Sequence, residues 1–176
     1  MPDANITKSA LARAMKKLMR KKDFQRISVT DICESCGMNR KSFYYHFKDK
    51  YDLMNWIFYT EFISKVTSEP VESGWELLVS VMDLFYKDQE FYKSALRTEG
   101  QNSFREYVHD SMLPIVTFTF ADSFEDDKEA ETMIEVFCDT CLSAAMQWLE
   151  HGCTVPPRDF IENIKRLILA IASTIK

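Results

Sequence analysis

One short stretch of the chain combines the residue types that bind nucleic acid. Residues 33–47 read CESCGMNRKSFYYHF and place two adjacent cations, Arg40 and Lys41, beside four aromatic side chains. A buried helix would not carry two neighbouring cations, and a fully solvated helix would not carry so many aromatics. Arginine can make a bidentate contact with guanine, and lysine can bind guanine or a phosphate. The stretch therefore predicts a helix that packs inward on one face and meets the DNA major groove on the other.

Two short helices that meet at a glycine turn would position these side chains as a helix-turn-helix. Gly37 suits the turn, and Asn39 is a good cap for the second helix. Phe43 and Phe47 lie four residues apart, so they would share the inward face. Outward residues at the start of the second helix would reach base edges, and their neighbours would reach phosphates. The residues predicted for the DNA interface are Thr30, Asn39, Arg40, Lys41, Ser42, Tyr44, Tyr45, His46 and Lys50.

Charge is distributed unevenly along the chain. Residues 1–56 hold twelve Lys and Arg against six Asp and Glu, which gives a net charge of +6. The chain totals of 22 and 27 leave ten and twenty-one for residues 57–176, a net charge of −11. A basic head on an acidic body is typical of a protein that binds a polyanion at one end. Chance clustering of solvated Lys and Arg would give the same asymmetry, so charge alone does not decide between the two.

Apolar residues recur at helical spacing through almost the whole chain, which predicts an all-α protein. With 176 residues, 46% of them hydrophobic and only four glycines, the chain can bury a helical core. The segment VTSEPVESG, with Pro70 and Gly74, is a clear joint, and Pro114 predicts a kink or break in its helix. Helices are expected at about residues 7–22, 29–35, 40–47, 51–64, 75–86, 89–96, 103–120, 129–150 and 157–174.

The segment ISVTDICESCGMNRKSFYYHFKDKYDLM resembles the DNA-binding signature of the TetR/AcrR transcriptional regulators, and FYYHF followed by KDKYDL is its most specific part. The resemblance covers about residues 7–57. It implies an all-helical homodimer, with three N-terminal helices for DNA and the remainder for ligand and dimerisation. Many members carry Ser or Thr at the position of Asn39, which is an equally good cap. FYKSALRTEGQNSFREY and a W-x-x-x-G pattern at Trp148 and Gly152 resemble a subgroup linked to dihydroxyacetone-kinase operons.

Two domains are therefore expected, a helix-turn-helix domain over residues 1–50 and a helical effector-binding and dimerisation domain over residues 51–176. The functional hypothesis is a dimeric repressor, or less often an activator, that binds a palindromic operator and is gated by a small molecule or a protein partner. No cofactor is expected. An enzyme is disfavoured, because the three histidines are scattered and no phosphate-binding glycine loop occurs. The chain lacks an apolar run of membrane length and a secretory signal, so we expect a cytoplasmic protein.

The last two expected helices carry apolar stripes that could pair with a symmetry mate in a four-helix interface. A stripe cannot name its partner, so packing within one chain is the alternative. The residues of this predicted dimer interface are Phe137, Cys141, Ala145, Ile164, Leu167, Ile168 and Ile171. Aromatic residues in the body predict a ligand pocket, although aromatics at helical spacing are more often core. The residues of this predicted pocket are Phe85, Tyr86, Phe91, Tyr92, Phe104, Tyr107, Phe118, Met146 and Trp148.

Cysteines occur in two C-x-x-C pairs, Cys33 with Cys36 and Cys138 with Cys141. Four thiolates at such spacing could hold zinc or respond to an oxidant. The pairs lie far apart in the sequence and within expected helices, not on the turns that metal knuckles use. We therefore predict that they are small packing residues and that no metal is bound. A redox-responsive or protein-interaction regulator is the alternative function that these pairs leave open.

Overall fold

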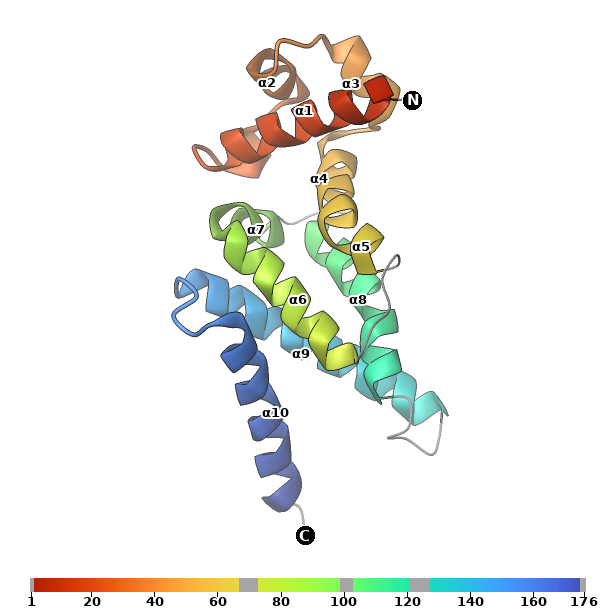
Figure 1. Ribbon diagram of the computed structural model, residues 1–176, viewed down its shortest axis with the longest axis vertical. Coiled ribbons are helices and arrows are strands. Elements are labelled where there is room, and N and C mark those ends of the chain that lie inside the picture. Colours follow the sequence, from red (N-terminus) through yellow and green to blue (C-terminus); the bar gives the residue numbers. More distant parts are fainter. Residues whose placement is uncertain (1, 67–72, 99–102, 121–126, 175–176) are drawn as a thin grey trace. The chain divides into compact units, whose positions relative to one another are not determined.

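The computed structural model describes residues 2–66, 73–98, 103–120 and 127–174, and these residues form helices joined by turns, without a strand. The all-α prediction is confirmed. No helix in the described ranges is long and apolar enough to cross a membrane. In chain order the elements are α1 (Pro2–Met19), the 3₁₀ helix η1 (Phe24–Arg26), α2 (Val29–Ser35), α3 (Arg40–His46), α4 (Lys50–Phe58), the π-helical turn η2 (Tyr59–Ile63), α5 (Ser64–Val66), α6 (Gly74–Lys87), α7 (Gln89–Leu96), α8 (Phe104–Phe120), α9 (Asp127–Glu150) and α10 (Pro157–Thr174) (Figure 1).

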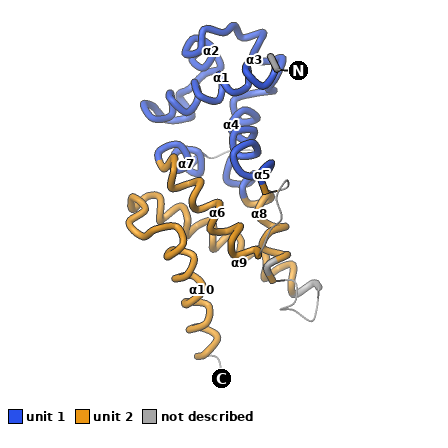
Figure 2. Tube along the Cα trace, in the orientation of Figure 1, with its two compact units in different colours: residues 1–65, 90–108 blue, residues 66–89, 109–176 orange. Residues whose placement is uncertain are grey.

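Contacts between Cα atoms divide the chain into two compact units (Figure 2). The first unit comprises residues 1–65 and 90–108, and the second comprises residues 66–89 and 109–176. Helix α7 thus clusters with α1 to α4, whereas α6, α9 and α10 form the second unit with most of α8. The units interleave along the chain, while the two domains expected from sequence are consecutive. A boundary placed along the sequence divides the chain into consecutive segments. It could therefore not show that residues 90–108 pack with residues 1–65.

Helices α1, α2 and α3 fold around one buried cluster in the first unit. Leu11 and Met15 of α1, Ile32 of α2 and Phe43 of α3 are fully buried. The ring of Phe47, just after α3, lies 5.8 Å from that of Phe43. These are the inward positions that the helical spacing predicted. Together they form the small core that holds α3 in place, and we call α1, α2 and α3 the head.

Three features differ from the sequence-based expectation or test it only in part. Helix α1 begins at Pro2, earlier than the expected start at Thr7, and proline is favoured in the first turn of a helix. Pro114 lies inside α8, which continues from Phe104 to Phe120 without a break. A proline removes one backbone donor, and a helix can continue on both sides of it. Pro70, in the expected joint, lies outside the described residues.

A charged cluster connects α1, η2 and α7 within the first unit. Lys16 Nζ donates to both carboxylate oxygens of Glu61, at 2.7 and 2.8 Å. The hydroxyl of the fully buried Tyr92 donates to Glu61 Oε2 at 2.6 Å. Lys16 Nζ also lies 4.7 Å from the centre of the Phe91 ring. A π-helical turn carries an extra residue and is frequent at functional sites, and here it contains Glu61.

Helices α6 and α10 pack against each other in the second unit. Arg158 of α10 and Glu76 of α6 form a bidentate ion pair, with N–O distances of 3.0 and 2.9 Å. Lys165 of α10 lies 4.9 Å from the centre of the Trp75 ring of α6. After α9, Gly152 adopts a φ of +76°, which favours glycine and ends the helix where the sequence indicated.

Candidate nucleic-acid interface

The start of α2 is fixed by a reciprocal cap that leaves Thr30 at the surface. The Ser28 hydroxyl accepts a bond from the Asp31 backbone N–H at 3.1 Å, and Asp31 Oδ2 accepts from the Ser28 backbone N–H at 2.7 Å. The bonds from Ser28, backbone first, and the neighbouring Lys22 ammonium lower the pKa of Asp31 to about 2. Thr30 follows Ser28 by two residues and is exposed in the first turn of α2.

The turn between α2 and α3 is shaped by Gly37 and closed by Asn39. Gly37 has a φ of +68°, in the left-handed region that favours glycine. Asn39 Oδ1 accepts the Ser42 backbone N–H at 2.8 Å and the Ser42 hydroxyl at 3.2 Å. Asn39 and Ser42, both predicted for the DNA interface, are thus bonded to each other at the start of α3. Their contribution to a DNA complex would be to aim the helix.

Helix α3 presents cationic and aromatic side chains outward. Arg40 and Lys41 are exposed, Tyr44 is 50% exposed and Tyr45 is 84% exposed, while Phe43 of the same helix is fully buried. Arg40 Nη2 donates to the Tyr44 hydroxyl at 3.4 Å, and its guanidinium lies 5.7 Å from the Tyr44 ring centre. The bond to Tyr44 raises the pKa of Arg40. Sequence reasoning did not pair these two residues, although their four-residue spacing on a helix was the available signal.

Aromatic contacts close the end of α3. His46 is half-buried, and its ring meets the Tyr45 ring edge-on, with centroids 4.9 Å apart. The buried Phe47 ring lies 5.7 Å from the Trp56 ring of α4. Lys8 Nζ of α1 is 5.6 Å from the centre of the Trp56 ring. The end of α3 is therefore packed against both α1 and α4.

Lys50 makes a set of contacts that the sequence did not indicate. Its Nζ donates to the backbone carbonyls of Phe24 at 2.8 Å, Gln25 at 3.2 Å and Ile27 at 2.9 Å. It also lies 4.4 Å from the centre of the Phe24 ring, and burial lowers the pKa of Lys50. An ammonium group has three donors, and these three bonds use all of them. The geometry favours a clamp between η1 and α4, which differs from the phosphate contact expected from sequence.

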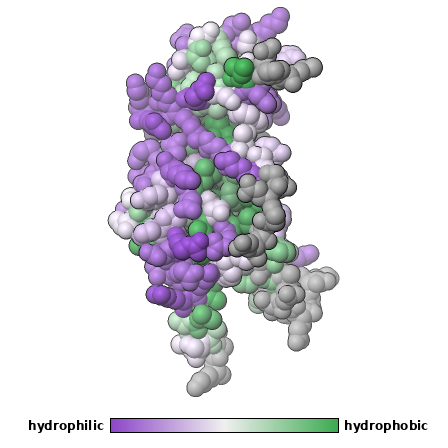
Figure 3. Space-filling view, viewed as in Figure 1, coloured by the Kyte–Doolittle hydropathy of each residue, from purple (hydrophilic) through white to green (hydrophobic). Residues whose placement is uncertain are grey.

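Helices α9 and α10 line an apolar groove of about 410 Å³ in the second unit. Leu167 and Ile171 are 60% and 51% exposed there, and hydrophobic side chains reach the surface along the C-terminal half of α10 (Figure 3). Six of the seven residues predicted for the dimer interface line it, and the seventh, Ala145, is buried. The lining residues are Thr132, Met133, Val136, Phe137, Thr140, Cys141, Ala144, Ile164, Leu167, Ile168 and Ile171. We call this surface the α9–α10 groove.

The nine aromatic and apolar residues predicted for a ligand pocket are divided between the units. In the first unit, the Tyr92 and Phe104 rings lie 6.1 Å apart, and both side chains are fully buried. In the second unit, Tyr86 stacks on Trp148 with ring centroids 6.1 Å apart, and Phe118 is exposed. The residues in the first unit are Phe91, Tyr92, Phe104 and Tyr107, and those in the second are Phe85, Tyr86, Phe118, Met146 and Trp148. Several therefore serve as packing residues within their own unit.

The two cysteine pairs also lie in different units, and their thiols are sheltered. Burial raises the pKa of Cys138 to about 11 and that of Cys141 to about 12. Burial likewise raises the pKa of Cys33 and of Cys36. A protonated thiol is a poor nucleophile and a poor metal ligand at neutral pH. Across the described ranges, no three His, Cys, Asp or Glu side chains are grouped so that they could hold a metal ion.

Comparison with known proteins gives matches along most of the chain. Residues 7–56 match the family model of bacterial regulatory proteins of the tetR family, and residues 75–170 match that of a transcriptional regulator C-terminal region. The HTH-type dhaKLM operon transcriptional activator DhaS of Lactococcus lactis subsp. lactis (strain IL1403) is 31% identical over 97 residues. That alignment covers 53% of this chain and 50% of the relative, so it spans half of the relative's length.

Solved structures share the fold over nearly the whole chain. The dihydroxyacetone kinase operon activator DhaS superimposes with a TM-score of 0.71 at 20% identity, covering 94% of this chain and 95% of that one. NalD, the secondary repressor of the MexAB-OprM multidrug efflux pump in Pseudomonas aeruginosa, gives 0.69 at 16% identity, with 97% of each chain covered. The fatty acid degradation regulator FadR from Bacillus halodurans gives 0.64 at 14% identity, covering 93% and 94%.

Proposed function

The chain belongs to the tetR family of bacterial regulatory proteins, and from this premise we propose that its α3 helix reads operator DNA in the major groove. Regulators of this family bind DNA and act as dimers, and they are not enzymes. The observation that carries the proposal is the exposed face of α3, where the Arg40 guanidinium donates to the Tyr44 hydroxyl at 3.4 Å while Phe43 of the same helix is buried. The planar guanidinium of arginine can make a bidentate contact with the edge of guanine.

The α9–α10 groove supports the second part of the proposal, a homodimer. Two helices that leave large apolar side chains exposed can bury them against the same two helices of a second copy. Leu167, Ile168 and Ile171 would form the centre of that interface. In such a dimer, two α3 helices about 34–36 Å apart would address successive turns of a palindromic operator.

Gating by an effector is the third part. A ligand or a protein partner would shift DNA affinity only as far as it binds the two states of the dimer differently. The helix from α4 through η2 is our candidate for carrying the change. The redox alternative is not favoured, because burial raises the pKa of the thiols in both C-x-x-C pairs.

We predict that the protein represses its target in the cytoplasm, where operator DNA is found. DhaS is named an activator and NalD a repressor, so proteins of this fold include both activators and repressors of transcription. Deletion of the gene tests directly whether the protein represses or activates transcription. Transcription from the bound promoter should rise in the deletion strain, and a fall would show activation instead.

The DNA proposal is tested by selecting bound fragments from genomic DNA and titrating the best of them with variants. Arg40→Ala should weaken specific binding by about 1–3 kcal/mol and relax the preference at one base pair. Lys41→Ala should weaken binding to every sequence and lower the salt slope by about 1 if it meets a phosphate. Lys87→Ala, at the exposed end of α6, is the matched control. Wild-type affinity and preference in Arg40→Ala would refute the role of α3.

A further inference from the structure

The carboxylate of Glu61 joins three elements of the first unit, α1, η2 and α7. Its Oε1 accepts from Lys16 Nζ of α1 at 2.7 Å. Its Oε2 accepts from the same ammonium at 2.8 Å and from the Tyr92 hydroxyl of α7 at 2.6 Å. Glu61 itself lies in the π turn that continues α4, and such turns bend their helices and are frequent at functional sites. We call Lys16, Glu61 and Tyr92 the Glu61 cluster.

The Glu61 cluster is largely sheltered from water. The side chains of Lys16 and Glu61 are 17% and 33% exposed, and Tyr92 is fully buried. Aromatic rings lie next to it, since Lys16 Nζ is 4.7 Å from the centre of the Phe91 ring and the Tyr92 ring is 6.1 Å from that of Phe104. Charge-assisted hydrogen bonds are short and directional, and they are stronger where little water competes. The cluster therefore fixes the spacing of its three elements more closely than apolar contacts alone would.

Helix α1 is shared between the Glu61 cluster and the head. Its Leu11 and Met15 are buried, as is Phe43 of α3, and Lys16 follows Met15 directly in the chain. One step along an α-helix turns the side chain by about 100°, so Lys16 leaves α1 in a different direction from Met15. Because the core of the head is closely packed, a shift of α1 against η2 and α7 would carry α3 with it.

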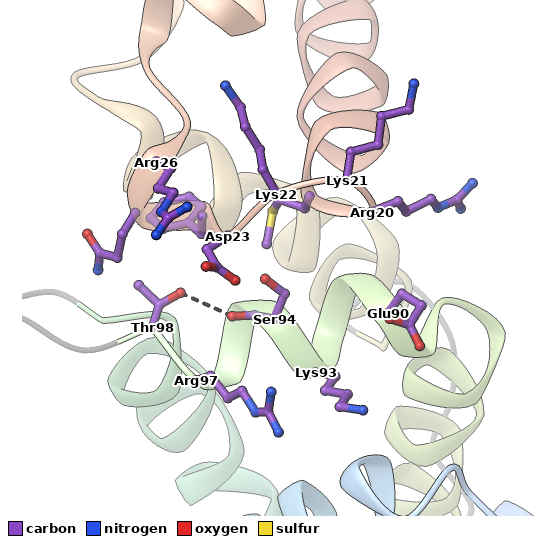
Figure 4. A pocket seen from close by; sticks show the side chains of 13 residues that line it. Arg20, Lys21, Lys22, Asp23, Arg26, Glu90, Lys93, Ser94, Arg97 and Thr98 are labelled. Atoms are coloured by element: carbon purple, nitrogen blue, oxygen red, sulfur yellow. Dashed lines mark hydrogen bonds between the residues drawn. The ribbon is translucent and has the colours of Figure 1, made fainter.

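Closer to its C-terminal end, α1 is separated from α7 by a polar groove of about 520 Å³ (Figure 4). The α1 residues that line this groove begin at Met19, one turn after Lys16. Figure 4 shows Arg20, Lys21 and Lys93 extending away from the space between the two helices. The two helices are thus apart at the groove, and the Glu61 cluster, one turn earlier in α1, connects them.

We propose that Glu61 positions the DNA-binding head. Through Lys16 and Tyr92 it sets the place of α1, and with it α3, relative to η2 and α7. This inference rests on the proposed function, because it requires that α3 reads DNA. It deepens that function by naming η2 and α7 as the elements from which regulation reaches the head. Glu61 makes no contact with DNA in this arrangement and acts through Lys16.

The test measures the affinity of the full chain for the genomic fragment that the wild type selects, with each variant shown to be folded by circular dichroism. Glu61→Gln keeps the size of the side chain and removes its charge. Operator affinity should fall by about two- to thirtyfold, the range for residues that couple distant sites. Removal of an acidic charge from a DNA-binding protein would by itself leave its affinity for DNA unchanged or raise it. The expected fall therefore has the opposite sign to the effect of charge alone.

Other variants separate positioning from stability and from direct contact with DNA. Glu76→Gln is the matched control, since it breaks a bidentate ion pair with Arg158 in the second unit, and it should bind DNA as the wild type does. Lys16→Met should lose as much affinity as Glu61→Gln and keep the salt slope of the wild type. The double variant should lose no more than either single variant, since both break one connection. Tyr92→Phe removes a single hydroxyl and should give a smaller loss in the same direction.

Three results would overturn the proposal while leaving DNA reading by α3 intact. The first is wild-type affinity in folded Glu61→Gln and Tyr92→Phe, which would make the cluster purely structural. The second is additive losses in Lys16→Met and Glu61→Gln, which would mean that the two residues act separately. The third is a lower salt slope in Lys16→Met, which would make this lysine a phosphate contact. A wild type that selects no DNA fragment would instead refute the proposed function, and this inference with it.

Discussion

Replacement of Lys50 by methionine separates two roles that the same residue could have. Methionine keeps an unbranched side chain as far as Cε and removes the ammonium, so the bonds to the Phe24, Gln25 and Ile27 carbonyls are lost. The bonds to Phe24 and Ile27 are half-buried, whereas the bond to Gln25 is exposed and water can replace it. We therefore expect a loss of folding stability from two bonds.

The magnitude follows from those two bonds. A hydrogen bond to a charged group contributes about 1.5–3 kcal/mol. Against this stands the cost of burying the ammonium, which is what lowers the pKa of Lys50. The net loss in Lys50→Met should be about 2–3 kcal/mol of unfolding free energy. For a chain of this length that corresponds to a fall in Tm on the order of 5–10 °C.

Two assays distinguish the clamp from a phosphate contact. Urea unfolding followed by circular dichroism gives the stability, and operator binding from about 50 to 200 mM salt gives the number of phosphates neutralised. The clamp predicts a large loss of stability and an unchanged salt slope, whereas a phosphate contact predicts a slope lower by about 1. Lys48→Met, at an exposed neighbouring lysine, should change stability by less than about 0.5 kcal/mol. If Lys50→Met is as stable as Lys48→Met and its salt slope drops, our reading of this residue is wrong.

Three further predictions concern stability and assembly. Tyr92→Phe removes a buried hydroxyl that donates to the Glu61 carboxylate and should cost about 1.5–3 kcal/mol in urea unfolding, more than an exposed Tyr→Phe change elsewhere. The pKa of Asp31 is lowered from 3.8 to about 2, so its cap with Ser28 should stabilise the fold above pH 3.8 and lose that effect as the pH falls toward 2. The urea midpoints of the wild type and of Asp31→Asn should therefore converge at low pH. A constant difference between the two midpoints at every pH would contradict this. Leu167→Glu places a charge in the α9–α10 groove and should give monomers in analytical ultracentrifugation, while an unchanged dimer would exclude that surface as the interface.

Local patterns predicted the elements well because each depends on residues close in sequence. The spacing of Leu11 and Met15 marks one face of a helix, and these residues are buried. Gly37 and Asn39 carry the backbone freedom and the side-chain acceptor that the turn before α3 requires. The same spacing indicated that Phe43 faces inward while Arg40 and Lys41 face solvent.

The sequence by itself determined the all-α class, the turn at Gly37 with the Asn39 cap, and the two faces of α3, since these follow from propensities and helical periodicity over a few residues. Tertiary structure alone decided which distant groups meet. Lys50 reaches carbonyls more than twenty residues away, Lys16 joins Glu61, and α7 packs into the unit that contains the head. A periodicity shows that a face is apolar or charged, but it carries no information on the partner across from that face, because that partner is fixed by the packing of the whole chain.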